Sequence, residues 1–270
     1  QGGNKSKANK NKARAHGGNK HKAKHALKDK DKDCPAHADG LVPSQFSDFR
    51  SATFWEGFFA SRAGKEFEWY GDWNTLGELI KQCVQRSGNK GEHAKADGAD
   101  GDGEILRLAK RRVLVPGCGN SELSPCMYDA GLTNITNVDF SVTCIREMLT
   151  KHVRSRPGMK WLVMDMTRTA FEDNSFDAVV DKGSLDALMG DGDDSDEGRR
   201  CGIAFLREVQ RLLDTTPNQP GATLAEANGN GNAHSNGSAN GGSPSCVYLV
   251  VTLAQGHVVR ALLDAFCGPP

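Results

Sequence analysis

A glycine-rich turn after a short apolar run is the first feature of this sequence that could do chemistry. The stretch VLVPGCGNSELS, residues 113–124, leads through Gly117, Cys118 and Gly119 into an amphipathic helix pattern. Glycines at such a turn let the backbone approach a ligand closely and leave N–H groups for an anionic or polar ligand. The turn therefore predicts a nucleotide-binding site. Cys118 is expected to be small filler, because no positioned base is evident to activate it.

The spacing around this turn narrows the choice of nucleotide. The dinucleotide fingerprint GxGxxG requires a third glycine at position 122, where this sequence has Glu122. A ribose-binding acidic residue is expected about 20 positions further on, at the end of the second strand. Asp139, in the stretch NVDFS, occupies that place after Gly119. The pattern therefore disfavours NAD while keeping a ribose-containing ligand.

Two further predicted strands also end in polar residues. LVMDMT supplies Asp165 and Met166, which suit an adenine amino group and ring, and AVVDKGSLDAL supplies Asp181 and Lys182 at the rim. Ligands of open α/β sheets bind beyond such strand ends. Each of Asp139, Asp165 and Asp181 could instead cap a following helix, and the residue types leave that alternative open.

The elements that must position these residues follow a regular alternation. Strands separated by helices predict a mostly parallel sheet with right-handed crossovers and helices on both faces, an α/β Rossmann-like fold. Strands are expected at 113–115, 135–140, 161–164, 176–181 and 246–255, and helices at 121–130, 142–153, 199–213 and 256–266.

An aromatic segment precedes this alternation. Apolar residues at helical spacing predict helices over 54–59 and 76–84, on either side of an aromatic loop. The stripe formed by Phe54, Trp55, Phe58 and Phe59 is expected to be core at least in part. Pure packing and participation in a site remain equal alternatives for it.

Composition shifts divide the chain into six segments. The first is a Lys-rich tail without aromatic residues, which is expected to be disordered and to touch nucleic acid only through charge. The segments are the tail at 1–45, a helical and aromatic cap at 46–87, a flexible insert at 88–110, the core at 111–214, a disordered low-complexity insert at 215–245, and a final strand and helix at 246–270.

Overall composition excludes several classes of protein. The 34 basic and 34 acidic side chains balance, so net charge does not indicate a partner. The eight cysteines form no CxxC pair or zinc spacing, which favours reduced thiols, a cytoplasmic location and no metal site. No apolar run reaches the roughly 20 residues of a membrane helix. The oligomeric state stays open.

Taken together, these residues resemble the class I S-adenosylmethionine-dependent methyltransferases. More narrowly, the chain is similar to the methyltransferase-like group that modifies elongation factor 1-alpha on lysines and its N-terminus. The resemblance runs from about residue 54 to residue 266, and the last two strands of the family's sheet have no counterpart, which indicates a fragment. The stretches that carry it are FWEGFF, FEWYGDW, VLVPGCGNSELS, NVDFS, MDMT, FEDNSFDAVVDKGSLDAL and LREVQRLL.

The resemblance implies a cofactor and a set of residues that hold it. The cofactor is S-adenosyl-L-methionine, with the two glycines of the turn, Gly117 and Gly119, beneath it. The other implied contacts are Trp55, Phe59 and Trp69 closing over it, Asp139 at the ribose, Phe140 at the adenine face, Asp165 and Met166 at the adenine edge, and Lys182 lining the site.

A protein substrate, possibly elongation factor 1-alpha, is implied in the same way. Its lysine amine, with an ordinary pKa of about 10.4, must lose a proton before it can accept a methyl group. Trp69 and Tyr70 are expected to form an aromatic wall that desolvates the amine, and Asp181 to orient it or to accept its proton through water. A methyltransferase acting on a small molecule or RNA, and a truncated non-catalytic cofactor-binding module, remain alternatives.

Overall fold

A computed structural model of the chain describes Pro43 and residues 46–62, 64–86, 101–190, 196–213 and 246–268. The chain divides into two units, Gln1–Val42 and Pro43–Pro270, and every described residue belongs to the second. Apart from Pro43, the predicted tail at 1–45 lies outside the described residues, as does the predicted insert at 215–245.

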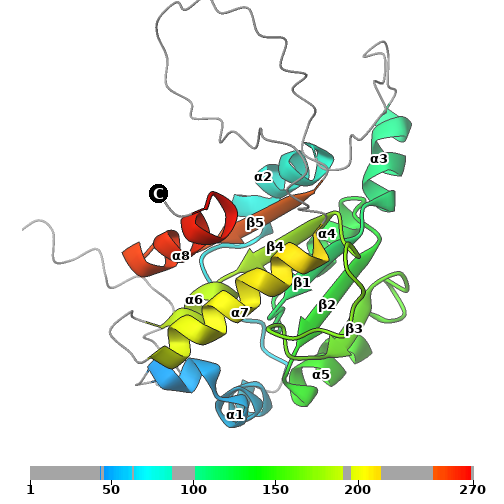
Figure 1. The fold of residues 1–270 in the computed structure, drawn as a ribbon. Helices are drawn as coiled ribbons and strands as arrows, with labels where there is room; N and C mark the ends of the chain where they lie inside the picture. Colours follow the sequence, from blue (N-terminus) through cyan, green and yellow to red (C-terminus); the bar gives the residue numbers. More distant parts are fainter. Residues whose placement is uncertain are drawn as a thin grey trace, which may run out of the picture. The chain divides into compact units, whose positions relative to one another are not determined.

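Five parallel strands form the central sheet of this unit (Figure 1). They are β1 (Val113–Pro116), β2 (Ile135–Asp139), β3 (Lys160–Val163), β4 (Ala178–Lys182) and β5 (Val247–Val251), in the order β3-β2-β1-β4-β5. β1 and β2 are buried along their whole length, as expected for strands that helices cover on both faces. The predicted parallel α/β fold is confirmed, and β5 forms one edge of the sheet within the described residues.

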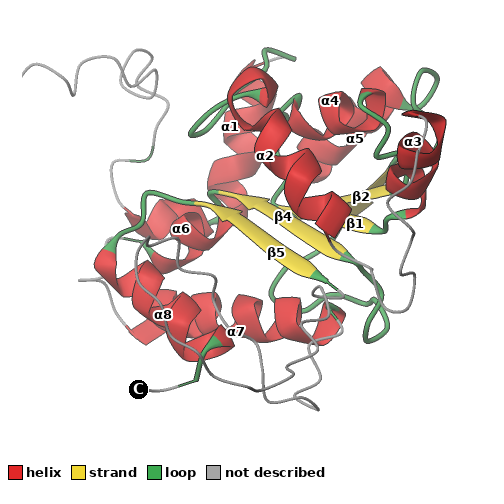
Figure 2. Cartoon of the chain, turned by 90° about the horizontal axis from the view of Figure 1, so that it is seen from above, coloured by secondary structure: helices red, strands yellow, loops and turns green. Residues whose placement is uncertain are grey.

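Helices cover both faces of the sheet (Figure 2). On one face lie α7 (Asp196–Leu212) and α8 (Gly256–Phe266), and on the other lie α2 (Trp73–Arg86), α4 (Leu123–Asp129) and α5 (Val142–His152). The remaining helices are a 3-10 turn, η2 (Phe46–Arg50), α1 (Ala52–Arg62), α3 (Gly101–Lys110) and α6 (Ser184–Met189).

Two helices differ from the sequence expectation. α3 occupies the last ten residues of the segment 88–110, for which a flexible insert was predicted. Its Leu108 is buried, so this part of the segment has an apolar anchor that the glycine-rich start of the insert obscured. α6 was not predicted, because its six residues follow directly on the end of a strand and are too few for a periodic pattern.

The last strand is also shorter than expected. The apolar run at 246–255 predicted one strand, whereas β5 ends at Val251. The Thr252 hydroxyl donates a 2.6 Å hydrogen bond to the Asp186 carboxylate, and Ala254 adopts a positive φ of 54°. These two features end the strand and tie the loop after it to α6.

The core between the sheet and α7 follows from helical periodicity. α7 buries Phe205, Leu206, Val209 and Leu212, whose spacing places them on one face of the helix. They pack in a single cluster with the β1 residue Leu114 and with apolar residues of β2, β4 and α6. Full burial of one such side chain contributes roughly 1.5–3 kcal/mol, so this cluster fixes the sheet that carries the strand ends.

Candidate functional site

The glycine turn follows β1, the strand at which the order of the strands in the sheet reverses relative to the chain. β1 lies between β2 and β4, and ligands of open α/β sheets bind beyond the carboxyl ends at such a point. Gly117 and Gly119, just after β1, have φ angles of 53° and 52°, a region that favours glycine. A Cβ on Gly117 would lie 2.5 Å from the Ser184 hydroxyl, and one on Gly119 would lie 3.6 Å from the Phe59 ring. The turn therefore requires glycine at 117 and brings α1 over the end of β1.

Cys118, between the two glycines, is a buried thiol. Its backbone N–H donates to the Val138 carbonyl at 3.0 Å, which ties the turn to β2. Burial raises the pKa of the thiol well above its ordinary value, and the nearby Asp139 carboxylate raises it further. A protonated, buried thiol is a poor nucleophile, as expected for a filler residue.

Asp139 holds two loops together at the end of β2. Its carboxylate accepts the Gly119 N–H at 3.0 Å and the Ser141 N–H at 2.9 Å. Ser141, and not Asp139, caps α5, because its hydroxyl accepts the Cys144 N–H. Asp139 is 6% exposed, and desolvation raises its pKa to about 6, although the backbone hydrogen bonds oppose this change. Each carboxylate oxygen accepts one of these N–H bonds and keeps acceptor capacity for a ligand hydroxyl.

Of the two residues predicted to bind adenine after β3, Asp165 is exposed and Met166 is buried. The Asp165 carboxylate is exposed and accepts hydrogen bonds from the Thr167 N–H at 2.8 Å and the Thr167 hydroxyl at 2.7 Å. No helix follows it before β4, so it stabilises a turn rather than capping a helix. Met166 belongs to the apolar core, and its sulfur lies 3.5 Å from the place of a Cβ on Gly117. Phe140, after β2, is half-buried.

Asp181 does not have the surroundings that the sequence led us to expect. It is completely buried, and its two oxygens accept hydrogen bonds from the Ser184 N–H at 2.8 Å, the Leu185 N–H at 3.2 Å and the Tyr248 hydroxyl at 3.0 Å. Desolvation raises its pKa to about 6. Because its oxygens are buried and stabilise the start of α6, this geometry favours the capping alternative over direct orientation of a substrate amine by Asp181.

Lys182 reaches across the strand ends to the segment 65–71, which we call the strap. Its ammonium donates to the Glu68 carboxylate at 2.7 Å and to the Trp69 carbonyl at 2.9 Å. The Lys182 side chain is 7% exposed and that of Glu68 is 26% exposed. The Lys182 side chain thus forms an ion pair with the strap, and its place in the lining of a cofactor site stays a prediction.

Tyr70, also in the strap, packs on the residue after β4. A Cβ on Gly183 would lie 2.8 Å from the Tyr70 ring, and Gly183 has a φ of 84°. Tyr70 itself adopts a positive φ of 59°, which is uncommon for a bulky residue and costs about 1–3 kcal/mol. Such strain is retained where the surrounding contacts hold the chain, here at the carboxyl end of β4.

The other predicted aromatic residues join α1 to the strap. The Trp55 ring stacks on Phe59 at a centroid distance of 5.7 Å, and its indole N–H donates to the Phe49 carbonyl at 2.8 Å. The Trp69 ring packs edge-on against Phe67 at 4.9 Å. The structure thus brings Phe59 to the glycine turn and Trp69 to Lys182, while Trp55 packs among neighbouring rings of α1 and η2.

Two carboxylates in this region were missed from the sequence. Glu68 accepts the Ser121 hydroxyl at 2.7 Å and the Glu122 N–H at 2.8 Å, in addition to Lys182. Glu56 accepts the Val142 N–H at 2.6 Å and the neighbouring N–H at 3.2 Å, so α1 caps α5. Hydrogen bonds from α5 hold the pKa of the Glu56 carboxyl below its ordinary value. A carboxylate inside an aromatic run was the available signal in both cases.

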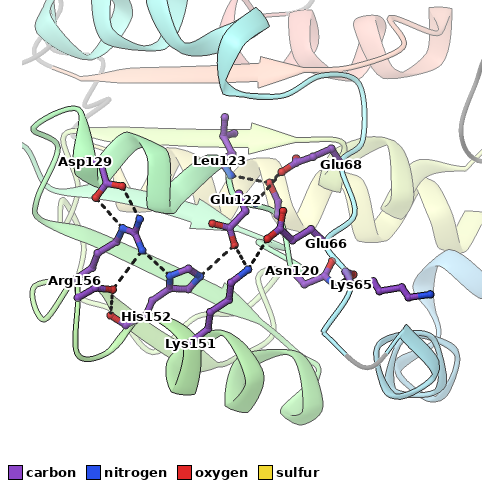
Figure 3. A network of polar contacts seen from close by, with 12 residues as sticks. Lys65, Glu66, Glu68, Asn120, Glu122, Leu123, Asp129, Lys151, His152 and Arg156 are labelled. Atoms are coloured by element: carbon purple, nitrogen blue, oxygen red, sulfur yellow. Dashed lines mark hydrogen bonds and ion pairs between the residues drawn. The ribbon is translucent and has the colours of Figure 1, made fainter.

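Glu122, which stands where a dinucleotide site has glycine, joins a polar network with α5 (Figure 3). Lys151 donates to it at 2.6 Å, and His152 Nε2 lies 3.3 Å away, an ion-pair separation without hydrogen-bond geometry. Arg156 donates to His152 Nδ1 at 2.8 Å, so the ring proton is assigned to Nε2, facing Glu122. Arg156 also forms a two-pronged contact with Asp129. The network fixes the end of α5 to the loop after the glycine turn.

The described residues contain neither a candidate metal cluster nor a candidate membrane-spanning helix. Within the ranges given above, no group of three or more His, Cys, Asp or Glu side chains has the arrangement of a metal site. None of the helices in the described part of the chain is long and apolar enough to cross a membrane.

Comparisons with known proteins agree with this geometry. Residues 114–215 match a family described as "Methyltransferase domain". An "eEF1A lysine and N-terminal methyltransferase" of Xenopus laevis is 39% identical over 84% of this chain and 25% of its own length. The Danio rerio protein of the same name is 32% identical over 84% of this chain and 24% of its own length. The chain therefore spans about a quarter of the length of these curated relatives.

A shorter relative and a solved structure complete the comparison. An "EEF1A lysine methyltransferase 4" of Mus musculus is 29% identical over 64% of this chain and 60% of its own length. A crystal structure of an S-adenosylmethionine-dependent methyltransferase from Methanosarcina mazei covers 37% of this chain and 46% of that chain at 24% identity. The TM-score of this match is 0.31.

The residues at the strand ends fit S-adenosylmethionine as the cofactor. The glycine turn at Gly117 and Gly119 lies just after β1, at the edge of the sheet where ligands of open α/β sheets bind. Asp139 keeps acceptor capacity for ribose hydroxyls at the end of β2, and the aromatic strap lies at the end of β4. With a parallel sheet in the order β3-β2-β1-β4-β5 and a match of residues 114–215 to the methyltransferase domain, the chain has the class I S-adenosylmethionine-dependent methyltransferase fold.

Proposed function

We propose that this chain transfers a methyl group from S-adenosylmethionine to a lysine side chain of a protein, with elongation factor 1-alpha as the candidate substrate. The observation that carries the proposal is the match, over 84% of the chain, to relatives named for lysine methylation of that factor. The chain corresponds to about a quarter of those relatives, so the substrate is part of the proposal.

The chemistry demanded of the protein is mainly positioning. The bound cofactor supplies an electrophilic methyl group on a sulfonium, and the acceptor must be a neutral amine aligned with it. Trp69 and Tyr70, held at the end of β4, offer aromatic faces that bind a cationic amine and partly exclude water. Partial desolvation lowers the pKa of a lysine amine and so favours its neutral form. The sequence predicts roles at the substrate amine for Tyr70 and Asp181, and of these two residues Tyr70 keeps that role in this proposal.

The amine proton is proposed to leave to water rather than to a carboxylate of the chain. Asp181, the carboxylate first considered for this step, is buried and accepts three hydrogen bonds. Its contribution to the reaction is to hold the start of α6 and with it the position of Gly183. A cytoplasmic location is proposed alongside, because no disulfide joins the cysteines of the described ranges, as expected in a reducing compartment.

The proposal is tested by methyl transfer from labelled cofactor. The chain is incubated with labelled S-adenosylmethionine and, in parallel, with purified elongation factor 1-alpha, total RNA or a small-molecule metabolite pool. Label is expected in the protein fraction alone, and Trp69→Ala should abolish most of it because the aromatic wall is gone. Label in RNA or in small molecules would move the function to another substrate class. Cofactor binding without transfer to any acceptor would favour a non-catalytic module.

A further inference from the structure

Glu68 joins the strap to two loops, the one after β1 and the one after β4. One oxygen accepts the Glu122 N–H at 2.8 Å, and the other accepts the Ser121 hydroxyl and the Lys182 ammonium, each at 2.7 Å. Ser121 and Glu122 follow the glycine turn after β1, and Lys182 ends β4. A single carboxylate therefore links three segments that are 53 to 114 residues apart in sequence.

The other contacts of the strap lie on either side of Glu68. The Asn120 side chain, which is buried, donates to the Lys65 carbonyl at 2.8 Å. Lys182 also donates to the Trp69 carbonyl, and the Tyr70 ring lies against the residue after β4. The strap is thus fastened to the β1 loop at one end and to the β4 loop at the other, with Glu68 contacting both.

The charges make this fastening depend on Glu68 more than on the neighbouring contacts. The Lys182 side chain is 7% exposed, and a buried ammonium without a counter-charge is strongly unfavourable. The other acceptor of that ammonium is the neutral Trp69 carbonyl. Without the Glu68 carboxylate, Lys182 would turn toward solvent and release its hold on the strap. Glu66, two residues earlier, pairs with Lys151 on the surface with its side chain 54% exposed, where an ion pair contributes little.

We propose that Glu68 is a positioning residue for the methyl-transfer reaction. Through Lys182, Ser121 and the Glu122 N–H it holds the strap across the ends of β1 and β4, so that Trp69 and Tyr70 cover the bound cofactor. The inference rests on the proposed function. It assigns to Glu68 no contact with the reacting atoms.

The test measures cofactor affinity and strap order in the unaltered chain and in matched variants. Titration calorimetry with S-adenosylhomocysteine should give a dissociation constant about tenfold higher for Glu68→Gln, because one charge-assisted contact is lost. Glu66→Gln, in the same strap, should leave it unchanged. Hydrogen exchange followed by mass spectrometry should increase in the strap and not in α7, a pattern that general destabilisation would not produce.

A double variant separates the ion pair from other effects of Glu68. If Glu68 acts through Lys182, Glu68→Gln combined with Lys182→Met should bind no more weakly than the weaker single variant. The inference would be overturned if the dissociation constant of the double variant rose by the product of the two single effects. It would also be overturned if Glu68→Gln left the dissociation constant unchanged, or if Glu66→Gln raised it as much as Glu68→Gln does.

A second variant covers the case in which Glu68→Gln does not fold. Ser121→Ala removes one donor and keeps the charge, and it should raise the constant about threefold; no change would overturn the inference. Failure of the unaltered chain to bind S-adenosylhomocysteine would overturn the proposed function itself. Equal binding by all variants would overturn only the role of Glu68.

Discussion

Lowering the pH should weaken cofactor binding through Asp139. This carboxylate is buried at the end of β2, and desolvation raises its pKa from 3.8 to about 6 despite two backbone hydrogen bonds. In its ionised form both oxygens have acceptor capacity for the ribose hydroxyls that we expect it to bind, whereas protonation turns one oxygen into a donor. Affinity is therefore expected above a pH of about 6 and lost as the pH falls through that value.

The size of the effect follows from the fraction of ionised carboxylate. With a pKa of about 6, nearly all of Asp139 is ionised at pH 7.5 and roughly a tenth at pH 5, so the dissociation constant should rise about tenfold. Titration of Asp139 is not expected to unfold the chain at low pH and so to interfere with the binding measurement. A carboxyl whose pKa is raised in the folded state contributes stability below its unfolded pKa and loses it as the pH rises through the folded pKa.

Titration calorimetry with S-adenosylhomocysteine between pH 5 and 7.5 measures this dependence, with circular dichroism as a check on folding. Asp139→Asn is the control, because it keeps the size of the side chain and removes its titration. The variant should bind more weakly at pH 7.5 and show a flat profile. A constant affinity in the unaltered chain, or a tenfold change that persists in Asp139→Asn, would refute the reasoning.

Three further changes test other parts of the structure. Tyr248→Phe removes one of three donors to the buried Asp181 and should lower the free energy of unfolding by about 1–2 kcal/mol in urea denaturation; weaker cofactor binding at full stability would contradict the capping role. Gly183→Ala places a methyl group 2.8 Å from the Tyr70 ring at a φ of 84° and should lower the free energy of unfolding by about 1–3 kcal/mol. Gly57→Ala, in an open helical position, should change the free energy of unfolding by less than about 1 kcal/mol. Equal melting temperatures for the two variants would contradict this expectation. Burial lowers the pKa of His152, so the stability that this group contributes is present above pH 6.5 and is lost as the pH falls through its folded-state pKa. His152→Gln should therefore remove this loss of stability between pH 7 and 5, as measured by urea denaturation at each pH.

The sheet was predictable because its signals are local. β1 and β4 are short, mainly apolar runs bounded by turn residues, and the more polar β2 lies at the expected spacing between two helices; β1 and β2 are buried throughout. The ends of β1, β2 and β4 then meet at one edge by the geometry of parallel strands alone. α3 and α6 were missed for a different reason. Each is brief, and each adjoins a glycine-rich or charged stretch in which helical periodicity cannot be counted.

The site was predictable in position but not in side-chain direction. Asp181 and Lys182 are neighbours on a strand, so one faces the core and the other the strap, and the sequence does not tell which. Both looked equally available for chemistry until the structure showed Asp181 buried. Glu68 escaped notice because its partners lie 53 to 114 residues away, a distance at which no local pattern operates.

The central claim, methyl transfer to a protein lysine, is tested most directly by locating the methyl group. The chain is incubated with S-adenosylmethionine carrying a deuterated methyl and with purified elongation factor 1-alpha, and the modified peptides are sequenced by mass spectrometry. Deuterated methyl on a lysine Nε, most of it lost with Trp69→Ala, is the result that we predict. Deuterium on another residue type, or on no residue while the chain binds the cofactor, would contradict the claim.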